Sequence, residues 1–429
     1  MNNTTITDKT TSPTSFAAWI GLDWGDREHA YCLALGREGE PEKGKLLHSA
    51  ENLHGWLKGL EERFGGRPVA LGLESNRGAL FHVLAQYPWL EIFPINPVTS
   101  ARYRKAFIPS GAKDDLPDAL ILLDLVRFHA HKLRPLLWDD ASTRKLAALV
   151  QARRDTVDRR TQGLNQLTGV LKSYYPQALE LVGEDLSAPM ALEFLRRWPD
   201  LIELKSARPA TLRRFYYRHN VRRPERVEKR LQGLPGMVAL TTDDAVVSVA
   251  RVQLKLLLEL ITTFNKHIAV FDARIAAAFA AHADQALFQE LPGAGKVLAP
   301  RLAVAFGSER TRYVDAASFQ KYAGLAPVRE KSGGQLWTHW RWQAPVFVRQ
   351  SLVEWAGQTV VWCPWAKRYY ERMKAKGKKH HVILRALAFK WSRILWKCWQ
   401  THTPYDDARY LKALKQRQSP NLPLTEAAA

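Results

Sequence analysis

The sequence predicts an α/β domain followed by a longer, mainly helical part. Short apolar runs alternate with segments of helical periodicity over residues 16–135, a pattern typical of a sheet covered by helices. From about residue 141 the character changes, and long arginine-rich stretches carry a helical pattern. A third part, about 286–405, is expected to be a small mixed or helical domain, and it holds nine of the fifteen tryptophans.

The first domain, residues 16–135, follows a polar segment, residues 1–15. That segment is interpreted as a disordered tail because it lacks the apolar core of a signal peptide. Within the domain the pattern predicts two strands joined by a tight connection, a buried strand with a helix, a further strand and a long helix. In chain order these segments are FAAWIGLDWG, HAYCLALG, PVALGLES with RGALFHVLAQY, LEIFPINP and LPDALILLDLVRFHAHKL.

Residues 141–285 form the predicted helical region. Its second long helix carries apolar residues in alternating steps of three and four: Leu254, Leu257, Ile261, Phe264, Ile268, Phe271 and Ile275. Such a seam predicts a coiled coil, within the chain or between chains, although a buried helix of an ordinary bundle would show the same spacing. We expect the seam to contact another protomer of a homo-oligomer. The basic, proline-punctuated segment 176–240 receives no assignment, and residues 406–429 are expected to be a tail.

The charge balance favours a polyanionic partner. The chain of 429 residues has 63 lysines and arginines against 42 acidic residues, a formal net charge of +21. Such an excess suits nucleic acid before an anionic membrane, although a solvated basic surface without a partner would give the same count. No apolar run reaches the roughly 18 residues of a membrane helix. Three cysteines, none in a CxxC pair, fit a reduced cytoplasmic protein and argue against a cysteine-based zinc site.

Four carboxylates in the first domain are candidate metal ligands. Asp23 and Glu74 each end a predicted strand, where side chains of α/β folds project past the rim of the sheet. Asp115 and Asp118 stand three residues apart at the start of a predicted helix and share one face. Clustered carboxylates raise one another's pKa, and a divalent cation that prefers oxygen ligands, Mg²⁺ or Mn²⁺, keeps them ionised. Two such ions roughly 4 Å apart can clamp the attacking and leaving oxygens of a phosphodiester.

These acids also have plainer interpretations. Asp115 followed by Asp118 imitates a helix N-cap with its reciprocal acid, and Pro117 suits a first helical turn. The stretch GLDWG around Asp23 is similar to the phosphate-binding turn of a sugar kinase, or to a simple β-turn. The metal-site interpretation depends on all four acids occurring in order in one domain of a strongly basic protein.

A glycine-rich turn is a candidate contact for a DNA phosphate. The stretch LPGAGKVLAPRLAVAFG (291–307) places Gly293, Gly295 and Lys296 between helical flanks. A helix–hairpin–helix uses such a turn to bring backbone N–H groups close to a phosphate without side-chain obstruction. A plain turn between two helices would have the same sequence pattern.

The segment 371–400 is a second candidate contact, with nine basic residues against one glutamate. Lysines can bind phosphates there while aromatic side chains stack on bases, and the lysines expected to do so are Lys376, Lys378 and Lys379. The tryptophans, including Trp391 and Trp399, are expected instead on the core side of an amphipathic helix. Adjacent His380 and His381 lack the partners of a zinc site.

Ser332 is the candidate nucleophile. It lies between two basic residues, Arg329 and Lys331, and two glycines, Gly333 and Gly334. The glycines let the backbone come close to a ligand, and the cations would steady a phosphate and favour an activated oxygen. From the residues alone, a serine before two glycines is equally a loop residue.

Three segments in the first domain, IGLDWG, LGLES and SGAKDDLPDA, resemble the DEDD blocks of a family of insertion-sequence transposases. These are the RuvC-like, Piv-related enzymes known as bridge-RNA-guided recombinases. The stretch YAGLAPVREKSGG resembles the second signature block of that family, which contains its nucleophilic serine. The resemblance extends over residues 16 to about 400. One departure is the stretch WRWQAPVFVRQSLVEWA, where many members have a segment rich in Lys or Arg, Gly and Asn, so the backbone contacts of that segment are in doubt here.

The resemblance implies an RNase H-like (RuvC-like) DEDD domain at 16–135, a helical coiled-coil linker at 141–285 and a serine-bearing transposase domain at 286–405. It further implies a bacterial transposase that exchanges strands of double-stranded DNA, guided by a structured RNA from its own element. Ser332 would attack the phosphodiester, and the four acids would bind Mg²⁺ or Mn²⁺. We expect a homo-oligomer, a dimer or a tetramer, in the cytoplasm.

Three other functions remain open from the sequence. A metal-dependent DNA nuclease or Holliday-junction resolvase would use water as nucleophile in place of Ser332. A kinase-like phosphotransferase is weakened by the lack of further glycine-rich phosphate loops. A DNA-packing protein without catalysis would leave the four acids unexplained.

Overall fold

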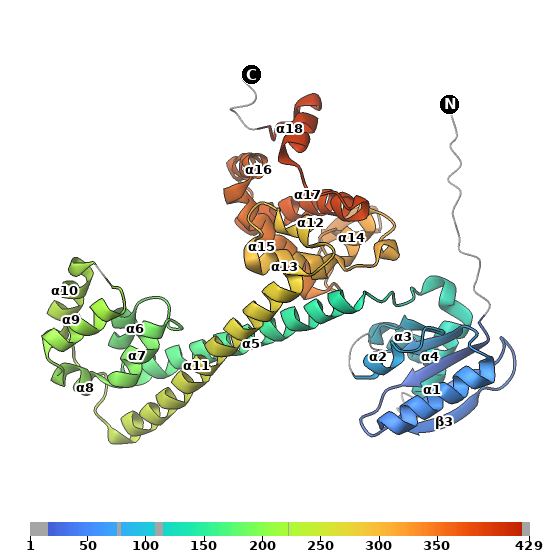
Figure 1. The fold of residues 1–429 in the computed structure, drawn as a ribbon, viewed down its shortest axis with the longest axis horizontal. Helices are drawn as coiled ribbons and strands as arrows, with labels where there is room; N and C mark the ends of the chain where they lie inside the picture. Colours follow the sequence, from blue (N-terminus) through green and yellow to red (C-terminus); the bar gives the residue numbers. More distant parts are fainter. Residues whose placement is uncertain (1–15, 75–78, 108–114, 222, 423–429) are drawn as a thin grey trace. The chain divides into compact units, whose positions relative to one another are not determined.

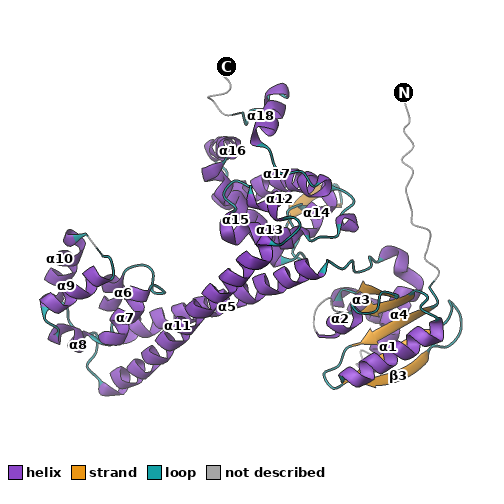
Figure 2. Cartoon of the chain, viewed as in Figure 1, coloured by secondary structure: helices purple, strands orange, loops and turns teal. Residues whose placement is uncertain are grey.

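The computed structural model describes residues 16–74, 79–107, 115–221 and 223–422, with only the backbone of Ala79 and Asp115 included. The chain divides into two compact units, the first ending at Trp138 and the second beginning at Asp139 (Figure 1). The first unit is α/β, and the second is almost entirely helical (Figure 2). Mixed α/β structure followed by a helical remainder is therefore confirmed.

The first unit contains a five-stranded sheet in the order β3-β2-β1-β4-β5. The first three strands run antiparallel as two hairpins, while β4 and β5 run parallel to β1. The strands are β1 (Ala18–Asp23), β2 (Glu28–Ala34), β3 (Glu42–Leu47), β4 (Val69–Leu73) and β5 (Leu90–Pro94).

Helices cover both faces of this sheet. On one face, the helix α1 (Ala50–Phe64) and the short α2 (Ala79–Leu84) pack against Ile20, Leu22 and Leu71. On the opposite face packs α4 (Asp115–His129), with α3 (Pro97–Phe107) beside it. The alternation of side chains along a strand explains this division. Even-numbered residues of β1 face α1, whereas its odd-numbered residues face α4. A short 3-10 helix η1 (Ala130–Lys132) follows α4.

In the second unit two long helices, α5 (Ala141–Tyr174) and α11 (Asp244–Ala280), lie side by side (Figure 1). All seven residues of the predicted seam on α11 are buried or half-buried. A Cβ added to Gly163 of α5 would lie 3.5 Å from Ile261 Cγ1, and Arg160 of α5 donates to Asn265 Oδ1 across 3.0 Å. The partner of the seam is thus α5 of the same chain. Ile261 and Ile268 are 0% and 7% exposed, so the expectation that they contact another protomer is corrected.

The unassigned segment 176–240 folds into a small helical lobe at one end of this helix pair. Three of its prolines (Pro189, Pro209 and Pro224) begin helices, a position where the missing N–H costs no hydrogen bond. Aromatic and aliphatic side chains of these helices share a core with α5 and α11. The elements are α6 (Gln177–Val182), α7 (Pro189–Arg197), α8 (Leu201–Ser206), α9 (Pro209–Arg218), α10 (Pro224–Gly233) and η2 (Leu234–Gly236).

The other end of the helix pair shares a second core with the C-terminal helices, which includes Val150 and Ile275. Four tryptophans, Trp355, Trp365, Trp391 and Trp399, are fully buried in it, as expected for the last two. The elements are α12 (Gln285–Gln289), α13 (Gly295–Phe306), η3 (Arg310–Arg312), α14 (Ala316–Tyr322), β6 (Val328–Ser332), β7 (Gln335–His339), α15 (Val346–Trp362), α16 (Pro364–Ala375), α17 (His380–Thr401) and α18 (Asp407–Gln416).

The expected tail 406–429 needs one correction. Asp406 caps α18 by accepting a hydrogen bond from the Arg409 N–H across 3.0 Å, and Leu411 and Leu414 of α18 are buried in the C-terminal core. Residues 407–416 are therefore a packed helix, whose two apolar residues at i and i+3 supply the energy for docking. Across the described part of the chain, none of the helices combines the length and the apolar character needed to span a bilayer.

Candidate active site

Asp23 and Glu74 lie next to each other at the carboxyl ends of two adjacent parallel strands. Leu22 of β1 and Leu73 of β4 are register partners, and Asp23 and Glu74 are the residues that directly follow them. Asp23 has the odd parity of the β1 side chains that face α4, and Glu74 continues the parity of Ala70, which also faces α4. Both acids are half-buried. The sheet thus directs two carboxylates to one face of one edge.

The helix α4 brings Asp118 toward the same edge. Gly21 of β1 and Gly72 of β4 are register partners beneath α4. A Cβ on Gly21 would lie 2.0 Å from the Ala119 carbonyl oxygen, and one on Gly72 would lie 2.7 Å from the Leu122 carbonyl oxygen. Only glycine permits this close approach. Asp118 directly precedes Ala119, whose carbonyl oxygen approaches Gly21. Gly21 itself lies two residues before Asp23 on β1.

Two side chains from α3 engage these acids. The hydroxyl of Ser100, itself buried, donates a hydrogen bond to the Glu74 carboxylate. Arg104, one helical turn on, forms an ion pair with Asp118, which is 7% exposed. The buried Asp118 carboxylate is therefore neutralised by a guanidinium.

The described residues alone contain no group of three or more His, Cys, Asp or Glu side chains placed to hold a metal ion. Asp23 and Glu74 supply adjoining oxygen donors of the kind that Mg²⁺ prefers, but Asp118 is engaged by Arg104. The side chain of Asp115 and the preceding residues 108–114 lie outside the described residues, so the fourth ligand and the N-cap alternative are untested.

Ser332 ends β6 at the tip of a two-stranded ribbon. Gly333 and Gly334 form the two-residue turn to β7, with φ of +54° and +81°, which suits a type I′ hairpin. A Cβ on either glycine would meet nothing within 4 Å, so the turn is surrounded by open space. Ser332 is exposed, and no side chain in the described ranges forms a hydrogen bond with its hydroxyl.

The pleat of the ribbon separates Ser332 from the two cations next to it in sequence. Arg329 and Lys331 fall on one face, and Glu330 and Ser332 fall on the other. The expectation that Arg329 and Lys331 steady the phosphate attacked by Ser332 is therefore not supported by their place on the ribbon. The glycines serve the turn geometry, as their positive φ values require.

On the face of Ser332, a glutamate is held by two neighbours. Glu330 accepts hydrogen bonds from Trp337 Nε1 at 2.9 Å and from His339 Nε2 at 2.7 Å. The hydrogen bond from His339 lowers the pKa of Glu330, with a further contribution from Trp337, and the same contact raises the pKa of His339. Glu330 is thus a poor proton acceptor for Ser332, and the ribbon does not itself supply a general base.

The glycine-rich turn connects α12 to α13, as both the helix–hairpin–helix interpretation and the plain-turn interpretation predict. Gly293 and Gly295 have φ of +70° and +54°. A Cβ on Gly293 would lie 2.7 Å from Trp362 Cδ1, whereas one on Gly295 would meet nothing within 4 Å. The turn therefore packs on α15 at its first glycine and leaves the N-terminus of α13 open at its second.

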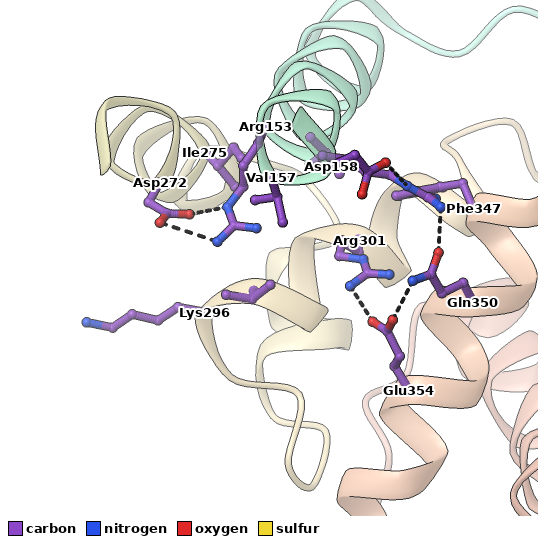
Figure 3. Close-up of a pocket in the computed structure, with 13 residues that line it drawn as sticks. Arg153, Val157, Asp158, Asp272, Ile275, Lys296, Arg301, Phe347, Gln350 and Glu354 are labelled. Atoms are coloured by element: carbon purple, nitrogen blue, oxygen red, sulfur yellow. Dashed lines mark hydrogen bonds and ion pairs between the residues drawn. The ribbon is translucent and has the colours of Figure 1, made fainter. Parts of the chain in front are cut away.

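Lys296, the second residue of α13, is one of the residues that line a cavity of about 160 Å³, and its amino end extends away from the other labelled side chains (Figure 3). The arginines in that cavity are already paired: Arg153 Nε lies 2.5 Å from Asp272 Oδ1, and Arg301 Nη1 lies 2.6 Å from Glu354 Oε2. Lys296 is exposed, and none of the described acids forms an ion pair with it. It is the basic residue of this region that remains available for a phosphate.

The three lysines Lys376, Lys378 and Lys379 lie in the connection between α16 and α17. All are exposed, and Gly377 between them has φ of +73°. The connection presents three cations within four residues, a concentration that suits a phosphate backbone.

Four residues of this region were not singled out from the sequence: Ser100, Arg104, Glu330 and His339. The first two act over long sequence distances, and no local pattern marks them. The last two had a signal, since a Gly-Gly pair between alternating residues predicts a hairpin and hence their shared face.

Comparison with known proteins identifies relatives of this chain. Residues 20–176 match a family model described as "Transposase", and residues 285–371 match one described as "Transposase IS116/IS110/IS902 family". The mini-circle putative transposase for IS117 from Streptomyces coelicolor is 27% identical over 408 residues, covering 94% of this chain and 98% of its own length.

Two further relatives also match along nearly the whole chain. An IS110 uncharacterized 43.6 kDa protein from Streptomyces coelicolor is 26% identical, covering 90% of this chain and 95% of its own length. An IS900 uncharacterized 42 kDa protein from Mycobacterium paratuberculosis is 24% identical, covering 91% and 97%. These matches favour DNA transposition over the kinase and DNA-packing alternatives.

Proposed function

Because the chain belongs to the IS110/IS117 family of transposases, and so recombines DNA, we propose that Ser332 is its nucleophile, with metal-binding carboxylates in the first unit. The observation that carries the proposal is the position of Ser332 at the exposed tip of a ribbon, on a turn that packs against nothing. A hydroxyl there can approach a phosphodiester inside a duplex. The strand order β3-β2-β1-β4-β5 supports an RNase H-like identity for the first unit.

The proposed reaction is a transesterification. The Ser332 oxygen bonds to phosphorus, the bond from phosphorus to one sugar oxygen breaks, and the departing oxygen takes up a proton. The product is a phosphoserine ester, which keeps the strand attached to the protein until a second hydroxyl displaces the serine. Since Glu330 is held by its two neighbours, we assign the acceptance of the serine proton to the carboxylates of the first unit.

The proposed metal ligands are Asp23, Glu74, Asp115 and Asp118. Bound Mg²⁺ or Mn²⁺ would supply positive charge to stabilise the charge that develops on the phosphate. Support comes from the adjoining positions of Asp23 and Glu74 and from the approach of α4 at Gly21. Ser100 would orient the Glu74 carboxylate, and Arg104 would neutralise Asp118 until the site is loaded.

Covalent trapping tests the nucleophile. The protein is incubated with end-labelled duplex DNA carrying an end of its own element, denatured, and examined for label on the polypeptide. We expect label on the wild type and on Gln335→Ala, which alters the cross-strand partner of Ser332 and keeps the serine. Ser332→Ala should bind DNA and carry none.

Label on Ser332→Ala would remove the serine from the mechanism. Free cleaved ends without label on the wild type would favour the alternative, a metal-dependent nuclease or junction resolvase that uses water. That alternative retains the same four carboxylates, so it predicts loss of cleavage in Asp23→Asn and retention in Ser332→Ala.

We further propose a structured RNA, encoded beside the gene, as a second nucleic-acid partner. The net charge of +21 and the exposed lysines near Lys376 suit a second polyanion besides the DNA. The RNA should co-purify with the protein when the whole element is present. Recombination that survives complete digestion of that RNA would contradict the proposal.

We assign nonspecific phosphate contacts to Lys376, Lys378 and Lys379, together with Lys296 and the open backbone at Gly295. Replacing the three lysines with glutamine should reduce the slope of log affinity against log salt by about 0.9 for each duplex phosphate lost. An unchanged slope would mean that these lysines are solvated surface.

A homo-oligomer remains part of the proposal, through a different surface. Exposed apolar residues follow one outer face of α11 at steps of three and four: Val249, Val252, Leu256 and Leu260, with exposed fractions of 55%, 71%, 55% and 41%. Since the inner seam is occupied by α5, a second copy would use this outer stripe.

Three unpaired cysteines also fit the reducing interior of a bacterial cell.

A further inference from the structure

A groove of about 630 Å³ lies at the base of the ribbon that carries Ser332. One wall comes from the ribbon and the residue after it, including Arg329 and Trp340. The other comes from α16 and α17, including Tyr369, Arg385 and Lys390. The groove is distinct from the carboxylates, from the glycine-rich turn and from the lysine-rich connection described above.

The charge of the groove is entirely positive. Five basic side chains take part in its lining, and no Asp or Glu is present among its described lining residues: the basic ones are Arg329, His339, Arg385, Lys390 and Arg393. Burial lowers the pKa of Lys390, and repulsion from Arg372 and Arg393 lowers it further. His339 is paired with Glu330, but no described acid forms an ion pair with Arg329, Arg385, Lys390 or Arg393, in contrast to the paired arginines of the cavity near Lys296. An anion bound there would relieve that repulsion.

Aromatic rings lie beside these cations. The Arg385 guanidinium is 3.7 Å from the centroid of the Trp340 ring, and Lys390 Nζ is 5.2 Å from that of Tyr369. Phe389 also lines the groove. Cations with adjacent flat rings match the two parts of a nucleotide, because the phosphate binds the cation while the base stacks on a ring or on a guanidinium plane. A paired base, stacked inside its helix, cannot reach such a ring.

The ribbon fixes how far this groove lies from Ser332. Arg329 precedes Ser332 by three residues of a regular strand, which corresponds to about 10 Å. A strand that follows the ribbon would therefore reach the groove within a few nucleotides of the phosphodiester at Ser332.

We propose that this groove binds an unpaired segment of the DNA strand, within a few nucleotides of the bond that Ser332 attacks. The choice of DNA over RNA rests on the proposed function, since the ribbon that forms the wall also carries the nucleophile. Strand exchange requires cut strands to leave their partners, and a site that takes only unpaired bases would hold such a strand while it changes duplex. Arg385 and Arg393 bind phosphate, and Trp340 stacks on a base.

The test measures binding alone, in full-length protein carrying Ser332→Ala, so that no catalysis is needed. The probe is a fluorescein-labelled oligodeoxythymidylate of about 12 nucleotides, followed by anisotropy over a range of salt. We expect Arg393→Gln and Arg385→Gln each to weaken binding several-fold and to reduce the salt slope by about 0.7, the value for one single-strand phosphate. Lys412→Gln removes an equal charge from an exposed position of α18, and it should change neither the affinity nor the salt slope.

Trp340→Ala should weaken binding about tenfold, while Trp340→Phe, which keeps a ring, should retain most of it. Thermal unfolding of each variant separates lost binding from lost folding, and Arg393, being exposed, is the variant least able to disturb the core. Equal binding by the variants and the parent would overturn the proposal.

Three comparisons test the identity of the ligand. If Arg393→Gln weakened the binding of duplex DNA as much as it weakened the binding of the single strand, the result would contradict a site for unpaired bases. An oligouridylate that binds more tightly than oligodeoxythymidylate, with the same loss in the variants, would assign the groove to RNA and overturn the DNA assignment. If Ser332→Ala were to form the covalent adduct, the proposed nucleophile would fail, yet the binding results at this groove would stand independently.

Discussion

Arg104 of α3 and Asp118 of α4 form an ion pair at the edge of the sheet where Asp23 and Glu74 end their strands. The pair is well shielded, since the Asp118 side chain is 9% exposed and that of Arg104 is 19% exposed. A cation that takes Asp118 as a ligand must compete with this guanidinium. The guanidinium therefore supplies a counter-charge to the buried Asp118 carboxylate.

Replacing Arg104 should make the protein more responsive to magnesium. Arg104→Gln removes the guanidinium that pairs with the buried Asp118 carboxylate, at a cost of about 3 kcal/mol in the free energy of unfolding. Added Mg²⁺ should recover part of that loss by mass action, so its effect on the melting temperature should be larger in Arg104→Gln than in the wild type.

The matched control for that measurement is Arg102→Gln, an exposed arginine on the same helix. It should melt as the wild type does and respond equally to Mg²⁺. A melting temperature of Arg104→Gln that stays low at every Mg²⁺ concentration would contradict the role of Asp118 as a metal ligand.

A histidine pair beside Asp23 should give the first unit a pH-dependent stability. His29 is buried, its Nδ1 accepts from the Gly25 N–H at 3.2 Å, and its Nε2 lies 3.1 Å from His48 Nδ1. Burial, followed by repulsion from His48, lowers the pKa of His29. The unfolded chain then binds a proton at a pH where the folded chain does not, so stability is present above the unfolded pKa of about 6.5 and is lost as the pH falls from there through the lowered pKa of the folded state.

Urea unfolding at about pH 7.5 and about pH 5.5 measures this dependence. The midpoint of the wild type should fall between the two pH values by more than that of His29→Gln, which cannot take up the proton. Trp24, whose ring stacks on His29 at 4.6 Å, should report the transition in the first unit through Trp24→Phe difference spectra. Equal pH dependence in both proteins would show that His29 charges without penalty in the fold.

Much of the first unit could be predicted, because its central strands are apolar on both faces. The runs that became β1, β4 and β5 are buried in the middle and on one side of the sheet, and burial on both faces leaves an uninterrupted apolar signal. The edge strand β3 was missed because EKGKLL is largely exposed and charged. The helix α1 was also missed, although Ser49 caps it and Gly65 ends it in the left-handed conformation.

The candidate site was predictable in its acids and not in its contacts. Strand ends mark Asp23 and Glu74 locally, but their adjacency depends on β1 pairing with β4 across some fifty residues, a choice that no local pattern makes. The contacts of Ser100 and Arg104 depend likewise on where α3 packs. The partner of the seam on α11 was undetermined for the same reason, since α5 and a second chain would bury the same residues.

The two apolar stripes of α11 should respond differently to substitution. Ile261→Ala should cost about 2–5 kcal/mol in the free energy of unfolding, because Ile261 is fully buried against α5. Leu256→Ser, on the exposed stripe, should change that free energy by less than about 0.5 kcal/mol. Light scattering should instead show that Leu256→Ser weakens self-association. A Leu256→Ser protein that assembles as the wild type does would exclude the outer stripe as the oligomer contact.

The turn at Gly333 should control catalysis without affecting the fold. Its φ of +54° lies in the left-handed region, which costs a residue with a side chain about 1–2 kcal/mol. A Cβ there would meet nothing within 4 Å, so any effect of substitution comes from the backbone conformation and not from a clash. Gly333→Val should therefore populate the hairpin less, displace Ser332 from its position and lower the yield of covalent adduct roughly tenfold.

Gly333→Asn is the matched control for this prediction, because asparagine tolerates the left-handed region and Asn-Gly is the preferred sequence of a type I′ turn. It should retain the adduct yield of the wild type. Both variants should have the melting temperature of the wild type, since the ribbon is exposed and contributes little to the C-terminal core. Adduct formation is measured by denaturing electrophoresis of labelled DNA. If Gly333→Val were as active as Gly333→Asn, the geometry of the turn would not position the nucleophile, and the hairpin would have to order only on DNA.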